Sequence, residues 1–71
     1  MTDPTTPLQD ATAADPAVGL RAVRALRDLA DRLERLQVLR ARELGWSWQD
    51  IADALGVSRQ AAHQKHRDSA R

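Results

Sequence analysis

Leucines recur at helical spacing through the middle of the chain. They step by three, four and three residues: Leu26, Leu29, Leu33 and Leu36. This is the a and d spacing of a coiled coil. Asp15 followed by Pro16 is a typical helix start, because aspartate accepts from free amides and proline loses no needed donor there. Gly45 can adopt the left-handed conformation that ends helices. The pattern predicts one long amphipathic helix over residues 16–45.

Two shorter helices are predicted after Gly45. Ser47 and Asp50 have the spacing of a capping box, which marks the start of the second helix. Gly56 ends that helix, and Ser58 caps a third helix that runs to about residue 68. A helix, a short glycine-containing turn and a helix form the helix-turn-helix arrangement. The sequence therefore predicts an all-α fold of three helices, with a helix-turn-helix unit at residues 46–71.

The long helix carries more apolar surface than the two short helices can cover. Their expected inward-facing residues are Trp48, Ile51, Ala52, Leu55, Val57, Ala61 and Ala62. This set covers about three helical turns, so we expect it to pack against Leu36, Leu39 and Leu44. The earlier leucines then have no partner within the chain, and we expect a homodimer, parallel or antiparallel. Its interface residues are predicted to be Val23, Leu26, Leu29 and Leu33. The alternative is that these leucines also pack on the chain's own later helices.

Residues 48–63, WQDIADALGVSRQAAH, carry a resemblance to a known class. Ala52 is small where two helices would cross, and Gly56 permits a positive φ in the turn. This stretch resembles small actinobacterial helix-turn-helix proteins and, more distantly, region four of sigma factors. The resemblance implies double-stranded DNA as the partner and transcriptional regulation as the role. The sequence departs from the pattern at Lys65 and His66, which replace an apolar and an aromatic residue.

One face of the third helix has the chemistry to read bases. Arginine can bond guanine through two donors, glutamine can pair with adenine, and histidine can donate to either acceptor. The predicted base-reading residues are Arg59, Gln60, His63 and Gln64. The predicted phosphate contacts are Ser58, Lys65, Arg67 and Arg71. Residues 58–71 carry four basic residues against Asp68, a local charge of +3 that suits a polyanion.

The N-terminal segment differs in composition from the rest. Residues 1–15 contain three aspartates, no basic residue and few apolar ones. Such a segment buries too little surface to offset the entropy of ordering, so we expect a disordered acidic tail. The tail carries a charge of −3. Because the net charge of the chain is +1, the remaining residues carry +4. It is either a solubilising leader or an acidic arm that competes with DNA for the basic face.

Several classes of function are excluded or disfavoured. The chain has no cysteine, which removes disulfides, thiolate metal sites and cysteine nucleophiles. No apolar stretch approaches the ~20 residues that span a bilayer, so we expect no membrane association and a cytoplasmic, nucleoid-associated location. His63 and His66 lack a third ligand, and Asp50 and Asp53 lack a pocket, so we expect neither metal, other cofactor nor enzymatic activity.

Two alternative functions remain open from the sequence. The leucine-rich helix is able to dock on RNA polymerase or a larger regulator, which would make the chain a protein-interaction module. The chain could also be an architectural or excision factor that assembles along DNA. DNA binding should weaken steeply with salt, whereas an apolar helix contact should not.

Overall fold

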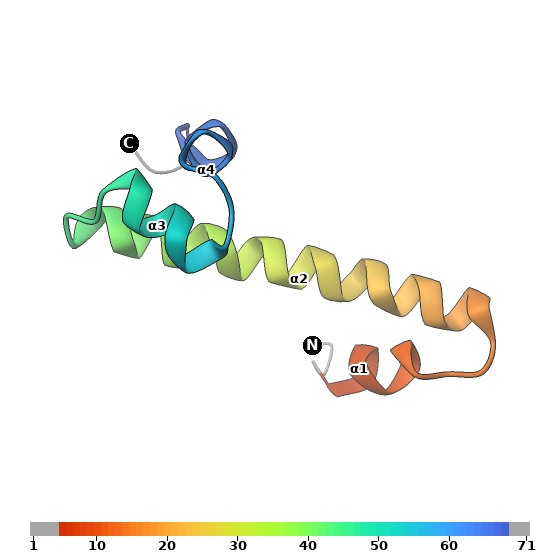
Figure 1. Ribbon diagram of the computed structural model, residues 1–71. Coiled ribbons are helices and arrows are strands. Elements are labelled where there is room, and N and C mark those ends of the chain that lie inside the picture. The colour runs from red at the N-terminus through yellow and green to blue at the C-terminus, as the bar shows by residue number, and fades with distance from the viewer. Residues whose placement is uncertain (1–4, 69–71) are drawn as a thin grey trace. The chain divides into compact units, whose positions relative to one another are not determined.

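A computed structural model describes residues 5–68, and this part of the chain is helical with short connections. The helices are α1 (Thr5–Ala11), α2 (Pro16–Glu43), α3 (Trp48–Leu55) and α4 (Arg59–His66), as Figure 1 shows. The predicted all-α class is confirmed. The chain divides into two compact units, with the boundary within α2 between Arg32 and Leu33. None of the described helices combines the length and apolar character needed to cross a membrane.

The ends of α2 and α3 follow local rules that the sequence already carries. Asp15 Oδ1 accepts from the amide of Ala17 at 2.9 Å, so the predicted start of α2 is confirmed. Gly45 has a φ of 86°, and Gly56 has a φ of 74°. After each helix, the amide of the next residue closes back onto a carbonyl of the last turn, Trp46 onto Ala41 and Val57 onto Ala52. Both helices therefore end in a Schellman motif, for which glycine is the favoured residue.

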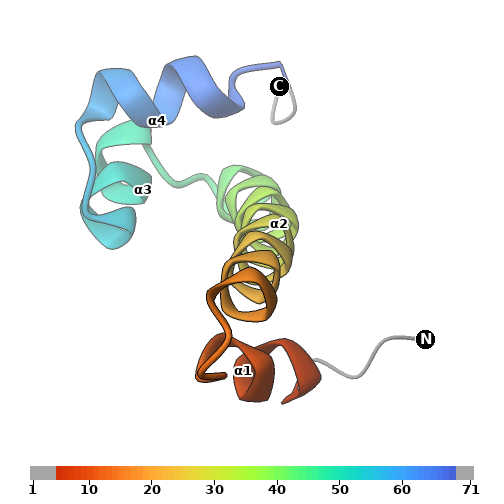
Figure 2. The same cartoon turned by 90° about the vertical axis from the view of Figure 1, so that its right-hand side faces the viewer.

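The structure adds a helix that the sequence analysis did not expect. Part of the segment expected to be disordered forms α1, so four helices replace the predicted three. Pro7 lies in the first turn, where its missing amide breaks no helical hydrogen bond. Figures 1 and 2 show α1 folded back beside the first turns of α2. Gly19 and Ala22 are buried there, and a Cβ at Gly19 would lie 3.8 Å from the carbonyl oxygen of Ala11. Residues 1–4 of the expected tail lie outside the described residues.

The core of residues 33–68 centres on a residue that the sequence analysis passed over. Val38 and Ile51 are each 3% exposed and form this core, with Ala41 and Trp48 packed against them. Ala52 and Ala62 are also buried. Four residues that were predicted to face inward are buried or partly buried in the structure: Trp48, Ile51, Ala52 and Ala62.

Other packing expectations are wrong. Leu36 and Leu44 are 63% and 70% exposed, and Leu39 is exposed too, although we expected α3 and α4 to cover all three. Successive helix positions turn by about 100°, so Val38 points well away from Leu36 and Leu39. The two short helices cover the side of α2 that carries Val38 and Ala41. The expected inward residues Leu55, Val57 and Ala61 are also exposed.

Candidate nucleic-acid interface

The helix-turn-helix unit is fixed by its own caps. Ser47 accepts from the amide of Asp50 at 3.1 Å, and Asp50 accepts in return from the amide of Ser47. The predicted capping box is therefore present. Ser58 accepts from the amide of Ala61 at 3.1 Å and caps α4. These caps position α4 across α3, as Figure 2 shows from the side, with the buried Ala52 and Ala62 small enough to permit close packing.

The structure exposes all four predicted base-reading residues. Their side chains lie on the outer part of α4: Arg59, Gln60, His63 and Gln64. Arg59 and Gln60 occupy its first turn, and His63 and Gln64 follow one turn later. A helix presented in this way offers guanidinium, amide and imidazole groups to an approaching base edge.

The predicted phosphate contacts fall into different settings. Ser58 is exposed at the N-terminus of α4, where helix amides favour anions. Arg67 is exposed just beyond the end of α4, whereas Arg71 lies outside the described residues. Lys65 forms an ion pair instead of standing alone: its Nζ is 2.9 Å from Glu34 Oε2.

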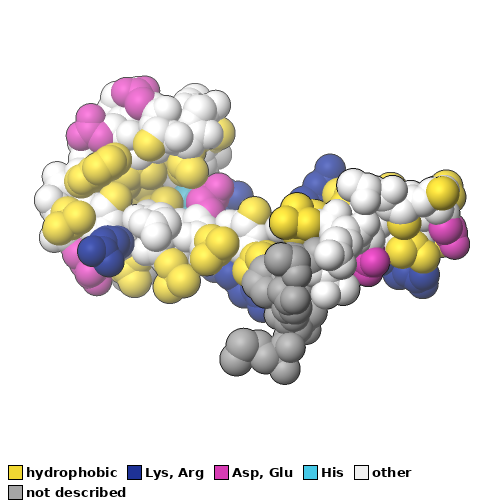
Figure 3. Space-filling model, turned by 90° about the horizontal axis from the view of Figure 1, so that it is seen from below, with side chains coloured by type: hydrophobic (Ala, Val, Ile, Leu, Met, Phe, Trp, Pro, Cys, Tyr) yellow, Lys and Arg dark blue, Asp and Glu magenta, His cyan; other side chains and the backbone are white. Residues whose placement is uncertain are grey.

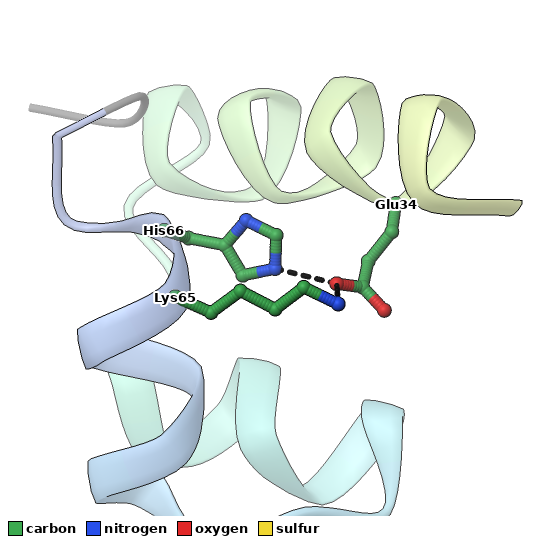
Figure 4. Close-up of polar contacts among 3 residues, drawn as sticks. All are labelled: Glu34, Lys65 and His66. Atoms are coloured by element: carbon green, nitrogen blue, oxygen red, sulfur yellow. Dashed lines mark hydrogen bonds and ion pairs between the residues drawn. The ribbon is translucent and has the colours of Figure 1, made fainter. Parts of the chain in front are cut away.

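Glu34 also holds a buried histidine, a contact that the sequence analysis missed. His66 is 1% exposed, and its Nε2 lies 2.6 Å from Glu34 Oε2. Figure 4 shows Lys65 and His66 reaching the same carboxylate from the end of α4. His66 therefore fills the core position where the sequence analysis noted a missing aromatic residue. One signal was available in the sequence: Glu34, Val38 and Ala41 have the i, i+4, i+7 spacing of one helix face.

The electrostatics of this cluster favour a charged carboxylate. The hydrogen bond from the Lys65 ammonium, aided by His66, holds the pKa of Glu34 below its ordinary value of 4.5 despite the opposing effect of burial. Glu34 therefore remains ionised at neutral pH and ties the end of α4 to α2.

A hollow at the surface lies beside the first turns of α4, and we call it the Trp48 hollow. Its lining residues are Trp48, Arg59, Gln60 and His63, and its volume is about 460 Å³. The rings of Trp48 and His63 meet edge to face, 5.2 Å apart at 79°. The Arg42 guanidinium lies 4.9 Å from the centre of the Trp48 ring, and Nη1 of Arg42 donates to the Trp46 carbonyl oxygen at 2.8 Å. Trp48 was expected in the core, and no feature of the sequence predicted the hollow.

The predicted dimer residues all belong to α2. Val23, Leu26 and Leu29 are half-buried in the single chain, and Leu33 is 52% exposed. Figure 3 shows many hydrophobic side chains at the surface of the molecule, and Leu36 and Leu44 are among the exposed ones. More apolar surface of α2 is therefore exposed to solvent than the sequence predicted.

The two histidines do not come together as a metal pair. His63 is exposed and its ring contacts Trp48, whereas His66 is buried and contacts Glu34. Within residues 5–68, no group of three or more potential ligand side chains is close enough to hold a metal ion.

The capped helices, the glycine turn and the exposed polar face of α4 define a helix-turn-helix DNA-binding domain. A family model described as a Homeodomain-like domain matches residues 29–68, more than half of the chain. The chain belongs to this Homeodomain-like family. The matched region contains α3, α4 and the part of α2 that packs on them. No curated protein and no solved structure matches the chain.

Proposed function

We propose that this protein is a homodimeric, sequence-specific transcriptional regulator that inserts α4 into the major groove of double-stranded DNA. The observation that carries the proposal is the exposed face of α4, where four side chains able to bond base edges stand on a rigidly capped helix. The family membership supports DNA as the partner. The resemblance of residues 48–63 to small actinobacterial helix-turn-helix proteins and to sigma region four supports a transcriptional role, which we place in the cytoplasm, at the nucleoid.

Each predicted contact has a role in this proposal. Arg59, Gln60, His63 and Gln64 read base edges. Ser58 and Arg67 bind phosphates and so fix the register of α4 on the duplex, and Arg71 adds a further phosphate contact. Lys65 reaches a phosphate from the edge of the core, with its charge shared between DNA and Glu34.

Dimerisation through α2 is the second part of the proposal. The leucine stripe, defined as Leu26, Leu29, Leu33 and Leu36, keeps the coiled-coil spacing. Its last two members are largely exposed, and the Val38 side of α2 packs on α3 and α4 instead. A second copy is the occupant whose spacing matches the stripe. A two-fold dimer binds two half-sites about one helical turn apart, roughly 34 Å.

The DNA part is tested by replacing one arginine on α4. A duplex recovered by selection from a random pool serves as the probe in anisotropy titrations. Arg59→Ala should weaken binding by about tenfold or more and relax the preference at one base, because a bidentate contact is worth ~1–3 kcal/mol. Arg24→Ala removes the same charge from an exposed position on α2 and serves as the matched control. Equal effects of the two variants would contradict base reading by Arg59.

The dimer is tested by placing a charge on the stripe. Leu33→Glu should convert the dimer to a monomer in sedimentation experiments, because a pair of buried carboxylates opposes association. Leu20 is exposed on a different side of α2, so Leu20→Glu is the matched control. A mass that is unchanged by Leu33→Glu would refute this interface.

A docking role on RNA polymerase or a larger regulator is the alternative that the exposed Leu36 and Leu44 favour. Binding through these leucines should hold or strengthen as salt rises, whereas DNA binding should fall steeply. An architectural or excision factor would instead cover DNA cooperatively, without a fixed site size. Titration at two salt concentrations on duplexes of two lengths separates these three functions.

A further inference from the structure

We propose that the Trp48 hollow receives the C5 methyl group of a thymine, so that the protein selects thymine at one position of each half-site. This inference rests on the proposed function, since it names what one part of the DNA-reading face recognises. It adds Trp48, a residue of α3, to the specificity-determining residues.

The location of the hollow favours a base edge as the occupant. Three of its four lining residues are Arg59, Gln60 and His63, which the sequence analysis selected independently as base-reading residues. A duplex that these side chains contact must bring its base edges to the mouth of the hollow. The fourth lining residue, Trp48, contributes an aromatic ring whose edge-to-face contact with His63 holds both rings in place.

The chemistry of the hollow favours a methyl group over other parts of DNA. Its Trp48 wall is an apolar ring, and the thymine methyl is the apolar group that base edges present in the major groove. Phosphates would meet better partners in Ser58 and Arg67, outside the hollow. A volume of about 460 Å³ admits the methyl group with the ring edge that bears it. Arg42 lies against the Trp48 ring and so supports the indole that forms the wall.

Removal of the methyl group from DNA tests the proposal without changing the protein. The probe is the duplex selected by this protein, with each thymine replaced in turn by deoxyuridine. We expect one position in each half-site at which affinity falls about fourfold, the equivalent of ~0.8 kcal/mol for one buried carbon group. Cytosine at that position should bind more weakly, and 5-methylcytosine should recover part of the loss. If deoxyuridine binds as tightly as thymine at every position, the proposal is wrong, and DNA recognition by α4 still stands.

A protein variant tests whether the methyl group lies in this hollow. Trp48→Ala should abolish the difference between thymine and deoxyuridine at the sensitive position. Trp46→Ala is the matched control, because Trp46 does not line the hollow, and it should preserve the difference. Circular dichroism verifies that each variant is folded. If Trp48→Ala fails to fold, His63→Ala replaces it, because His63 is an exposed lining residue, and it should reduce the same difference.

The outcomes separate this proposal from the proposed function. A methyl effect that persists in folded Trp48→Ala, or that is undiminished in His63→Ala if Trp48→Ala does not fold, places the methyl group elsewhere and overturns the assignment. A selection that recovers no duplex overturns both the proposed function and the inference. A methyl effect confined to one position and lost only in the variants of the hollow supports both.

Discussion

At the residue scale, the central feature is the carboxylate of Glu34, which binds two side chains of α4. It accepts from the buried His66 and pairs with the exposed Lys65. The Nε2 donor of this buried imidazole has a hydrogen-bond partner only while that carboxylate is present, and Nδ1 of the same ring is buried without one. The orientation of α4 therefore depends on Glu34, a residue of α2.

Removal of Glu34 should destabilise the domain. Glu34→Ala leaves His66 Nε2 without its acceptor, and a buried unsatisfied group costs about 1–3 kcal/mol in the free energy of unfolding. Urea denaturation followed by circular dichroism measures this change. Glu43→Ala, an exposed glutamate on the same helix, is the control and should change stability by less than about 0.5 kcal/mol. Equal costs for the two variants would show that the Glu34 contacts contribute nothing.

The same carboxylate predicts a pH dependence. The pKa of Glu34 is lowered in the folded state, chiefly by Lys65, so its ionised form stabilises the fold above its unfolded pKa of about 4.5. This contribution disappears as the pH falls below 4.5 and through the lower folded pKa. The difference in unfolding free energy between the wild type and Glu34→Gln should therefore be largest near pH 7 and shrink below pH 4.5. A difference that stays constant from pH 7 to pH 3 would contradict this explanation.

Residue-scale features set by local chemistry were predictable from the sequence, whereas those set by long-range packing were not. The caps at Asp15, Ser47 and Ser58 follow from short-range hydrogen bonding, and the structure has all three. The burial of His66 depends on Glu34, 32 residues earlier in the chain. No local rule pairs these two residues, and the sequence marked His66 only as a departure from the resembling proteins and as one of two histidines too few to hold a metal ion.

At the scale of elements, α2 presents two differently used sides. Within residues 33–43, Val38 and Ala41 pack against α3 and α4, whereas Leu33 and Leu36 of the leucine stripe are exposed. The helix was predicted correctly, but Leu36, Leu39 and Leu44 were expected on its covered side, where the structure has Val38 and Ala41. The reason is physical: Val38 and Ala41 are smaller than the leucines and let the short helices pack closely on α2.

The charges after the stripe favour an antiparallel pair. Arg40 and Glu43 continue the spacing beyond Leu36, so a parallel pair in register would place each beside its own copy. An antiparallel pair centred near residue 31 matches Leu26 with Leu36 of the second copy and avoids both like-charge contacts.

Cysteine cross-linking measures the orientation, and the absence of native cysteine removes any background. Leu26→Cys mixed with Leu36→Cys should form a disulfide-linked heterodimer under mild oxidation, because the pair comes within bridging distance only when the helices are antiparallel. Leu26→Cys alone should form little. Rapid linkage of Leu26→Cys to itself, with none between the mixed chains, would establish the parallel arrangement instead.

At the scale of the whole molecule, the nearly neutral net charge results from an acidic N-terminal segment and a basic remainder. Within that segment, α1 contacts α2 near Gly19. Composition predicted the separation of charge but not α1, because the burial of Gly19 and Ala22 depends on tertiary contact. We expect the acidic segment to compete with DNA for the basic face.

Neutralising the segment should tighten DNA binding. Asp3→Asn combined with Asp10→Asn removes two negative charges and leaves the Asp15 cap of α2 in place. Affinity should rise by a few-fold at low salt and approach the wild-type value at high salt, because salt screens exposed charges. Anisotropy titrations at two salt concentrations provide the measurement. Identical affinities at low salt would leave the segment as a solubilising leader.

The most direct test of sequence-specific DNA recognition by a dimer is selection from a random duplex pool, followed by anisotropy titration of the winners against scrambled DNA. We predict a palindromic winner, with half-sites about one helical turn apart, that binds at least ~10³-fold more tightly than scrambled DNA at the same salt concentration. An absence of enrichment, with weak binding that vanishes as salt rises, would contradict this account and identify α4 as a non-specific basic helix.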